Sequence, residues 1–131
     1  MPIFIDRMKV ILPVLFGQDF SRAFLNNIVK EADEAVVLGI IDADKMEKAS
    51  GSEMANIAEI EGRVEKVEDY LIRKGVNTKS AVQWGEMERI ITNTAKLHKA
   101  NKVVLLYTPE EFFPKIVRIL KKELSCELEV V

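Results

Sequence analysis

Short apolar segments that alternate with segments of helical periodicity dominate this sequence and limit the folds it can adopt. Residues 9–15 (KVILPVL), 35–41 (AVVLGII) and 102–107 (KVVLLY) are almost continuously apolar, as strands covered on both faces should be. Residues 76–84 alternate between apolar and polar, which predicts a strand with one wetter face near a sheet edge. Residues 126–131 (CELEVV) alternate too. The sequence therefore predicts five strands.

Between these strands the apolar period changes from two to about 3.6 residues, as in amphipathic helices. Asp19 or Ser21 can cap the first helix. The second follows Ser50, which stands three residues before Glu53 in the spacing of a capping box, and it ends at Gly75. We therefore expect a helix after the first and after the second strand.

Two further helices follow the third and fourth strands. For the third helix we expect the buried stripe to consist of Met87, Ile90, Ile91, Thr94 and Leu97. Before the fourth, Thr108 is a good N-cap and Pro109 suits the first helical position. Pro114 cannot donate to an earlier carbonyl, so the main helix is expected to start near Pro114, after a short separate turn.

Strand and helix thus alternate four times before a final strand. This order predicts a doubly wound α/β domain, with a five-stranded parallel sheet and helices on both faces. Sheets in the order 3-2-1-4-5 and in the flavodoxin-like order 2-1-3-4-5 both fit the alternation. We expect one domain over residues 1–131 with its core in 8–131 and a long loop at 42–52. Residues 1–7 are either an extra strand or an extension.

Composition excludes several classes of protein. The 19 basic and 21 acidic residues nearly balance, so the chain lacks the basic stripe that nucleic acids require. The single cysteine forms no internal disulfide and no zinc cluster. The apolar runs are shorter than the roughly 20 residues of a membrane span, and the N-terminus lacks the order of a signal peptide. We expect a cytoplasmic protein that binds neither membranes nor nucleic acid.

The turn after the fourth strand, TPEE at residues 108–111, is where a nucleotide's phosphates would bind in a doubly wound sheet. Phosphates need free backbone N–H groups and a glycine that permits close approach. Here Thr108 and Glu111 are placed to satisfy the turn, and the carboxylates occupy the positive end of the helix dipole. The turn is therefore expected to repel a triphosphate.

From Lys9 to Val131 the chain resembles the universal stress proteins. Residues 9–15 are similar to that family's first strand, usually ILVPVD, and residues 82–107 to its third strand, glycine turn, helix and fourth strand. The ending LKKELSCELEVV resembles the family's closing CPVLVV. The resemblance implies a 3-2-1-4-5 sheet and a role in the stress response.

The nucleotide-binding motifs of that family do not carry over. Its ATP-binding branch ends the first strand with aspartate, where this chain has Leu15. That branch also has a glycine-rich phosphate motif after the fourth strand, and residues 107–120 contain no glycine. Gly17 is the only glycine near the expected cleft. We therefore expect no cofactor, and ATP in particular is not expected.

Side chains at the carboxyl ends of the strands form a candidate ligand site. Trp84 and Tyr107 either cover a small apolar or planar ligand or plug the cleft, and the apolar neighbours favour the plug. The candidate ligand-binding residues are Leu15, Phe16, Gly17, Ile41, Asp42, Trp84, Tyr107 and Thr108.

Other reactive residues have structural interpretations. His98 is expected on the surface near a helix C-terminus, without a nucleophile beside it. Cys126 is expected to be a buried thiol. Asp42 and Asp44 could help to hold a hard cation, but they lack further oxygen ligands, so we favour solvation in a loop. The sequence identifies no catalytic residue and no metal site.

The last strand should lie at a sheet edge, which is open to pairing. The resemblance implies a homodimer through antiparallel pairing of this strand, with Leu128 and Val130 in the interface and Glu127 and Glu129 at its rim. We expect a dimeric regulatory or protective module, not an enzyme, with a possible protein partner. A sensor of a small non-phosphorylated ligand and a weak ATP or AMP binder or hydrolase are the alternatives.

Overall fold

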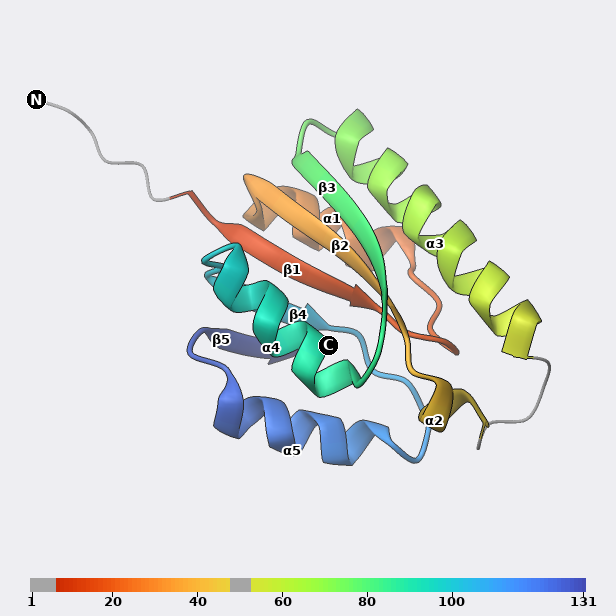
Figure 1. Ribbon diagram of the computed structural model, residues 1–131. Helices are drawn as coiled ribbons and strands as arrows, with labels where there is room; N and C mark the ends of the chain where they lie inside the picture. The colour runs from red at the N-terminus through yellow and green to blue at the C-terminus, as the bar shows by residue number, and fades with distance from the viewer. Residues whose placement is uncertain (1–6, 48–52) are drawn as a thin grey trace, which may run out of the picture.

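The computed structural model describes residues 7–47 and 53–131, which form a single parallel sheet with helices on both faces (Figure 1). The strands are β1 (Lys9–Val14), β2 (Glu34–Ile41), β3 (Asn77–Trp84), β4 (Lys102–Leu105) and β5 (Glu127–Val130). The helices are α1 (Arg22–Glu31), α2 (Ala43–Glu47), α3 (Glu53–Arg73), α4 (Met87–Leu97) and α5 (Phe113–Glu123). The sheet order is β3-β2-β1-β4-β5. The expected fold class is confirmed, and so is the strand order that periodicity left open.

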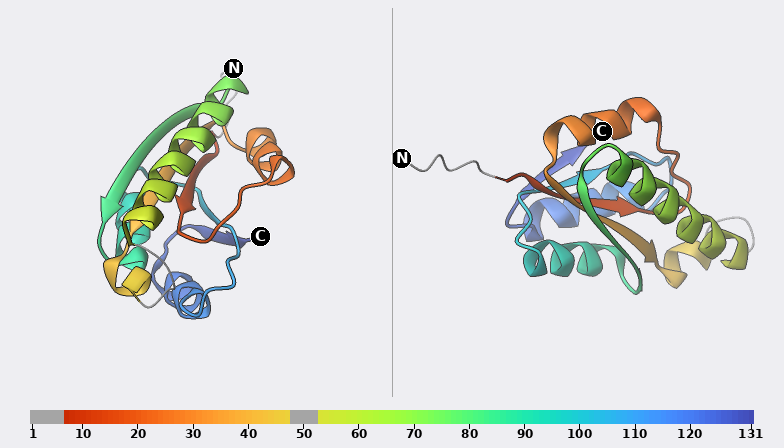
Figure 2. Two further views of the ribbon diagram at one scale, coloured as in Figure 1. Left: turned by 90° about the vertical axis from the view of Figure 1, so that its right-hand side faces the viewer. Right: turned by 90° about the horizontal axis from the view of Figure 1, so that it is seen from above.

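The helices cover the sheet in two layers. α1 and α3 contact one another on one face, and α4 and α5 contact one another on the other (Figure 2). This division follows from right-handed crossovers, because the chain moves outward from β1 to β3 and then returns to β4. The strands β1, β2 and β4 are covered on both faces and almost wholly buried. Their continuously apolar sequences have the pattern expected of central strands.

Helix boundaries follow the local signals in most places. Ser21 caps α1, and its Oγ accepts a hydrogen bond of 3.1 Å from Phe24 N. Gly75 follows α3 with φ +91°, a backbone conformation that favours glycine. The expected capping box of α3 includes Ser50, which lies outside the described residues.

Three local expectations are wrong. The segment 42–52 is not a continuous loop, since Ala43–Glu47 form α2 and residues 48–52 lie outside the described part. Leu97, the last residue of α4, is 78% exposed, and Ala95 is buried instead. Thr108 does not cap α5, because that helix starts five residues later at Phe113. The expected start of the main helix near Pro114 is confirmed.

Candidate functional site at the ends of β1 and β4

The order of the strands reverses between β1 and β4, which is where doubly wound sheets bind ligands. The two strands pair only through Val10 with Lys102 and Ile11 with Val103. Pro13 explains this short ladder. Odd-numbered residues of β1 face β4, as the bond from Asn101 N to Lys9 O (2.9 Å) shows, so the missing N–H of Pro13 lies on the β4 side. The strands therefore part before their carboxyl ends.

Gln18 closes the gap that the parted strands leave. Its Oε1 accepts a hydrogen bond from Leu15 N at 2.8 Å, and its Nε2 donates to Leu106 O at 2.7 Å. The side chain is only 2% exposed. Arg63 of α3 donates to the backbone carbonyl of Gln18 and so fixes the loop from the helix side. One glutamine thus replaces the missing part of the β1–β4 ladder and occupies the switch point.

The turn after β4 packs against the same loop. A Cβ atom at Gly17, whose φ is +79°, would lie 3.2 Å from Glu110 Oε1 and 3.4 Å from Thr108 Oγ1. Thr108 is buried, and its hydroxyl has no hydrogen-bond partner within the described residues. Glu110 O accepts from Phe113 N at 3.1 Å, so this turn leads directly into α5. A hydroxyl and a carboxylate therefore lie beside Gly17, where a phosphate-binding loop would present amides.

Aromatic rings cover the closed gap. Phe16 packs on Phe112 with ring centroids 5.2 Å apart. Tyr107 meets Phe113 edge to face at 5.3 Å. Both pairs join the end of β1 or β4 to the start of α5. They add apolar contact beside the switch point.

The structure brings together only some of the residues expected to line a cleft. Leu15, Phe16 and Thr108 are buried beside Gly17 at the ends of β1 and β4. Tyr107 lies nearby but is largely exposed. The other expected residues belong to a second group at the ends of β2 and β3, which contains Ile41, Asp42 and Trp84.

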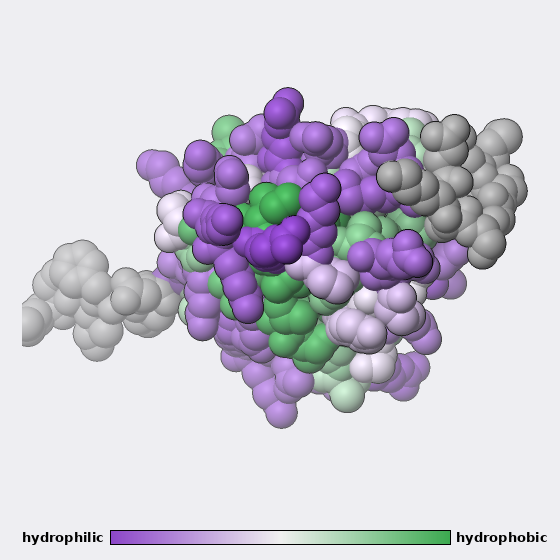
Figure 3. All heavy atoms as spheres, turned by 90° about the horizontal axis from the view of Figure 1, so that it is seen from below, coloured by the Kyte–Doolittle hydropathy of each residue, from purple (hydrophilic) through white to green (hydrophobic). Residues whose placement is uncertain are grey.

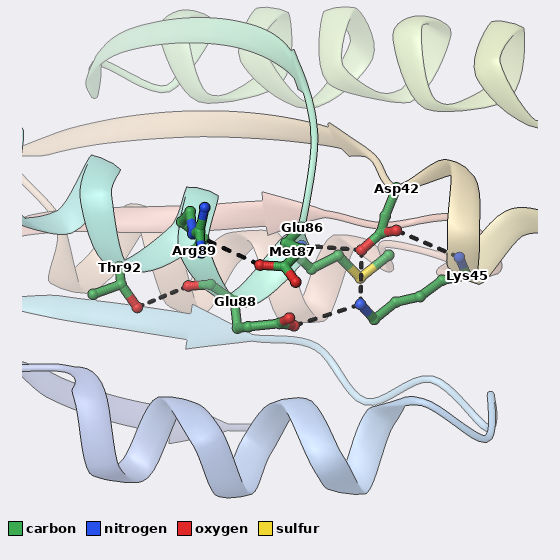
Figure 4. A network of polar contacts seen from close by, with 7 residues as sticks. All are labelled: Asp42, Lys45, Glu86, Met87, Glu88, Arg89 and Thr92. Atoms are coloured by element: carbon green, nitrogen blue, oxygen red, sulfur yellow. Dashed lines mark hydrogen bonds and ion pairs between the residues drawn. The ribbon is translucent and has the colours of Figure 1, made fainter.

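Asp42 has a structural partner in this second group (Figure 4). Its buried carboxylate accepts from Lys45 Nζ at 2.7 Å and from Met87 N, the first amide of α4, at 3.1 Å. Glu88 lies 3.5 Å from the same ammonium. Asp42 therefore caps α4 and ties it to α2. The expectation of a solvated Asp42 is wrong, whereas Asp44 is exposed.

Two buried or half-buried lysines are held charged by carboxylates. Burial acts to lower the pKa of Lys45, but the hydrogen bond and the charge of Asp42 outweigh it and raise that pKa. Burial likewise acts to lower the pKa of Lys102 in β4. The hydrogen bonds and charges of Glu129 and Glu31 outweigh it and raise that pKa. Its ammonium lies 2.5 Å from Glu31 Oε1 and also contacts Glu129. These ion pairs tie β4 and β5 to the end of α1.

The remaining candidates show no catalytic arrangement. His98 is half-buried at the C-terminal end of α4, and its amide donates to Thr94 O at 3.0 Å. Burial raises the pKa of the Cys126 thiol, which favours the unreactive protonated form. Among residues 7–47 and 53–131, no three His, Cys, Asp or Glu side chains lie together as a metal site.

Two hollows on the described surface lie away from the ends of β1 and β4. One groove of about 380 Å³ runs between α4 and α5 and is lined mostly by polar and charged residues, among them Arg89, Lys96 and Glu123. A hollow of about 500 Å³ lies along α3 beside Gly62. Neither is lined by residues at the ends of β1 and β4. In the described part of the chain, no helix has the length and apolarity to cross a bilayer.

No family model matches this sequence, and no curated protein matches it. Its fold is nevertheless shared with solved structures of universal stress proteins. The hypothetical protein MJ0577 superposes with a TM-score of 0.72 at 17% identity, over 97% of this chain and 96% of that one. A universal stress protein in complex with cAMP superposes with a TM-score of 0.64 at 11% identity, over 95% of this chain and 96% of that one. The universal stress protein from Archaeoglobus fulgidus in complex with dAMP superposes with a TM-score of 0.57 at 10% identity, over 94% of this chain and 96% of that one. At these identities the likeness establishes the fold.

Sequence reasoning missed Gln18. The chain contains only two glutamines, and this one follows an apolar strand and a glycine. Pro13, in the middle of an otherwise central strand, was the available signal that a ladder breaks there.

Proposed function

We propose that this chain is a universal-stress-protein-like cytoplasmic module that works through protein contacts, as a homodimer, without binding nucleotide. Its role would be regulatory or protective, and no catalytic step is assigned to it. The observation that carries the proposal is Gln18, whose side chain bonds to both parted strands at the switch point. A nucleotide bound at the switch point would have to displace this side chain and break one buried and one partly buried hydrogen bond.

The charges around the closed gap also support the proposal. Glu110 lies beside Gly17, where an incoming phosphate would need a donor. Leu15 stands where the nucleotide-binding branch of the family has aspartate, and it is fully buried. The turn after β4 offers no glycine between residues 107 and 120. A phosphate here would meet a carboxylate and no flexible amide loop.

The dimer is supported by the open sheet edges and by exposed apolar residues. Figure 3, which views the molecule from the α5 side, shows a band of hydrophobic residues framed by hydrophilic ones. Val130 is 41% exposed at the end of β5, while Leu128 is half-buried. Pairing of β5 with a second β5 would cover both, as the family resemblance implies.

Calorimetric titration with ATP and with AMP in the presence of Mg²⁺ tests the absence of nucleotide binding. Several proteins of this fold were solved with cAMP, dAMP or AMP bound, so the adenine nucleotides are the right probes. We expect no saturable heat up to about 1 mM nucleotide, which corresponds to binding weaker than about −4 kcal/mol. The universal stress protein solved with AMP provides the positive control.

The Gln18→Ala variant provides the matched test of the mechanism. If this variant binds AMP and the native chain does not, Gln18 is the group that closes the site. Saturable micromolar binding by the native chain would refute the proposal and favour a nucleotide binder or hydrolase. Binding of a non-phosphorylated ligand at Leu15, Phe16 and Tyr107 would favour the sensor.

A further inference from the structure

We propose that a hollow at the amino ends of β1, β2 and β3 binds a phosphate-type oxyanion, either as the free ion or as a monoester. The hollow has a volume of about 70 Å³, which gives room for several water molecules or one small anion. Its polar lining residues are Lys9, Glu34, Asn77, Lys79 and His98. This site goes beyond the proposed function, because it lies at the opposite end of the strands from the switch point.

The register of the strands places these polar residues side by side. Lys9 of β1 is the neighbour of Glu34 in β2, and Glu34 is the neighbour of Asn77 in β3. Lys79 stands two residues after Asn77 and therefore points to the same face of the sheet. His98 at the end of α4 lines the same hollow, so this is the face that α4 covers.

The end of α4 contributes an imidazole to the hollow. The amides of residues 98–100 donate to carbonyl groups in the last turn of α4, and Lys99 reverses the chain with φ +52°. Those carbonyl groups are thus occupied. Asn101 N then donates to Lys9 O at 2.9 Å, and its side-chain oxygen accepts from Lys9 N at 2.8 Å. The start of β1 therefore lies against the end of α4, as Figure 1 shows.

Positive charge exceeds negative charge around the hollow. Glu34 is the only acidic lining residue, and its carboxylate lies 3.3 Å from Lys9 Nζ and 3.8 Å from an Arg7 nitrogen. The Asp33 carboxylate accepts a backbone hydrogen bond of 2.8 Å and does not line the hollow. Lys79 adds a second lysine to the lining. An anion therefore fits this charge balance, whereas a cation would meet three basic side chains.

The lining groups suit an oxyanion because most of them donate hydrogen bonds. Each ammonium carries three donors, the Asn77 amide carries two, and an imidazole carries at least one N–H. Hydrogen bonds from ammonium groups to phosphate oxygens are stronger than those between neutral groups. Exposed charges are screened by salt, so we expect a dissociation constant on the order of 10 mM. Such binding is too weak to give a saturable heat in the nucleotide titration.

His98 provides the measurement, because it is the only histidine of the chain and its Cε1 proton gives one assignable NMR resonance. Inorganic phosphate is titrated to about 50 mM at fixed pH, with sodium chloride holding the ionic strength constant. We expect a saturable shift of this resonance, and no shift with chloride alone. Methyl phosphate forms a second titration: equal binding assigns the site to phosphomonoesters as well, and weaker binding assigns it to the free ion.

Two variants should change the affinity in opposite directions. Lys79→Gln removes a positive charge from an exposed position and should weaken phosphate binding about two- to fivefold. Glu34→Gln removes the carboxylate of the hollow and should strengthen binding by a similar factor. Lys66→Gln is the matched control, because it removes the same charge from an exposed position on α3, and it should leave binding unchanged.

Three results would overturn this proposal: a His98 resonance that does not move with phosphate, Lys79→Gln and Lys66→Gln curves that coincide, or binding that Glu34→Gln fails to strengthen. None of these results bears on the switch point, where the calorimetric titration and Gln18→Ala decide. A nucleotide whose phosphate binds at this hollow would move the His98 resonance, which distinguishes such binding from binding at the ends of β1 and β4.

Discussion

Replacing Gln18 by alanine tests whether one side chain holds the ends of β1 and β4 together. The substitution removes the acceptor for Leu15 N and the donor to Leu106 O. Leu15 is fully buried, so water cannot readily replace the lost partner. A buried polar group without a partner costs about 1–3 kcal/mol. For the two groups together, we expect the free energy of unfolding to fall by about 2–6 kcal/mol, which is a large part of the roughly 5–15 kcal/mol of an ordinary domain.

Urea unfolding followed by far-UV circular dichroism measures this loss. Gln18→Met keeps most of the side-chain volume but neither hydrogen bond, so it should lose nearly as much stability and thereby separate hydrogen bonding from packing. Gln83→Ala is the control, because the other glutamine is exposed on β3, and it should change stability by less than about 0.5 kcal/mol. If Gln18→Ala and Gln83→Ala unfold at the same urea concentration, Gln18 does not bridge the strands and the closed switch point is refuted.

Three further predictions concern stability. Asp42→Asn should lower the free energy of unfolding in urea by about 1–3 kcal/mol, because it weakens a buried ion pair. Asp44→Asn, at an exposed position, should lower it by less than about 0.5 kcal/mol. The pKa of Lys45 is raised, so its ion pair contributes fully below the ordinary lysine value and is lost only as the pH rises through the raised value. As the pH rises into the alkaline range, the free energy of unfolding should therefore fall more in the native chain than in Asp42→Asn. An equal fall in both proteins would contradict this. Gly62→Ala, inside α3 with nothing near the added methyl group, should stabilise by about 0.5–1 kcal/mol, whereas Gly75→Ala at φ +91° should destabilise by about 1 kcal/mol; calorimetric melting would show opposite shifts.

The candidate site was only partly predictable, and the reason is local. Leu15 and Phe16 end an apolar strand, so their position beside the switch point followed from the alternation of strands and helices. The turn at Thr108 shows where local reasoning failed. Its sequence favours an N-cap, but α5 starts at Phe113 and the threonine is buried against Gly17. A capping motif satisfies local amides only if the chain turns into a helix there, and contacts with the β1 loop decided otherwise.

The sequence by itself determined the five strands and the four longer helices, because that choice depends on the period of apolar residues, whereas α2 lies in a segment that was expected to be a loop. It also determined that β1, β2 and β4 are central, since only buried strands are apolar on both faces. The tertiary structure alone decided the partners of isolated polar residues. Lys102 is separated by 71 residues from Glu31, and Gln18 by 88 residues from Leu106. Periodicity carries no information about contacts at such separations, so the closure of the switch point became visible only in the fold.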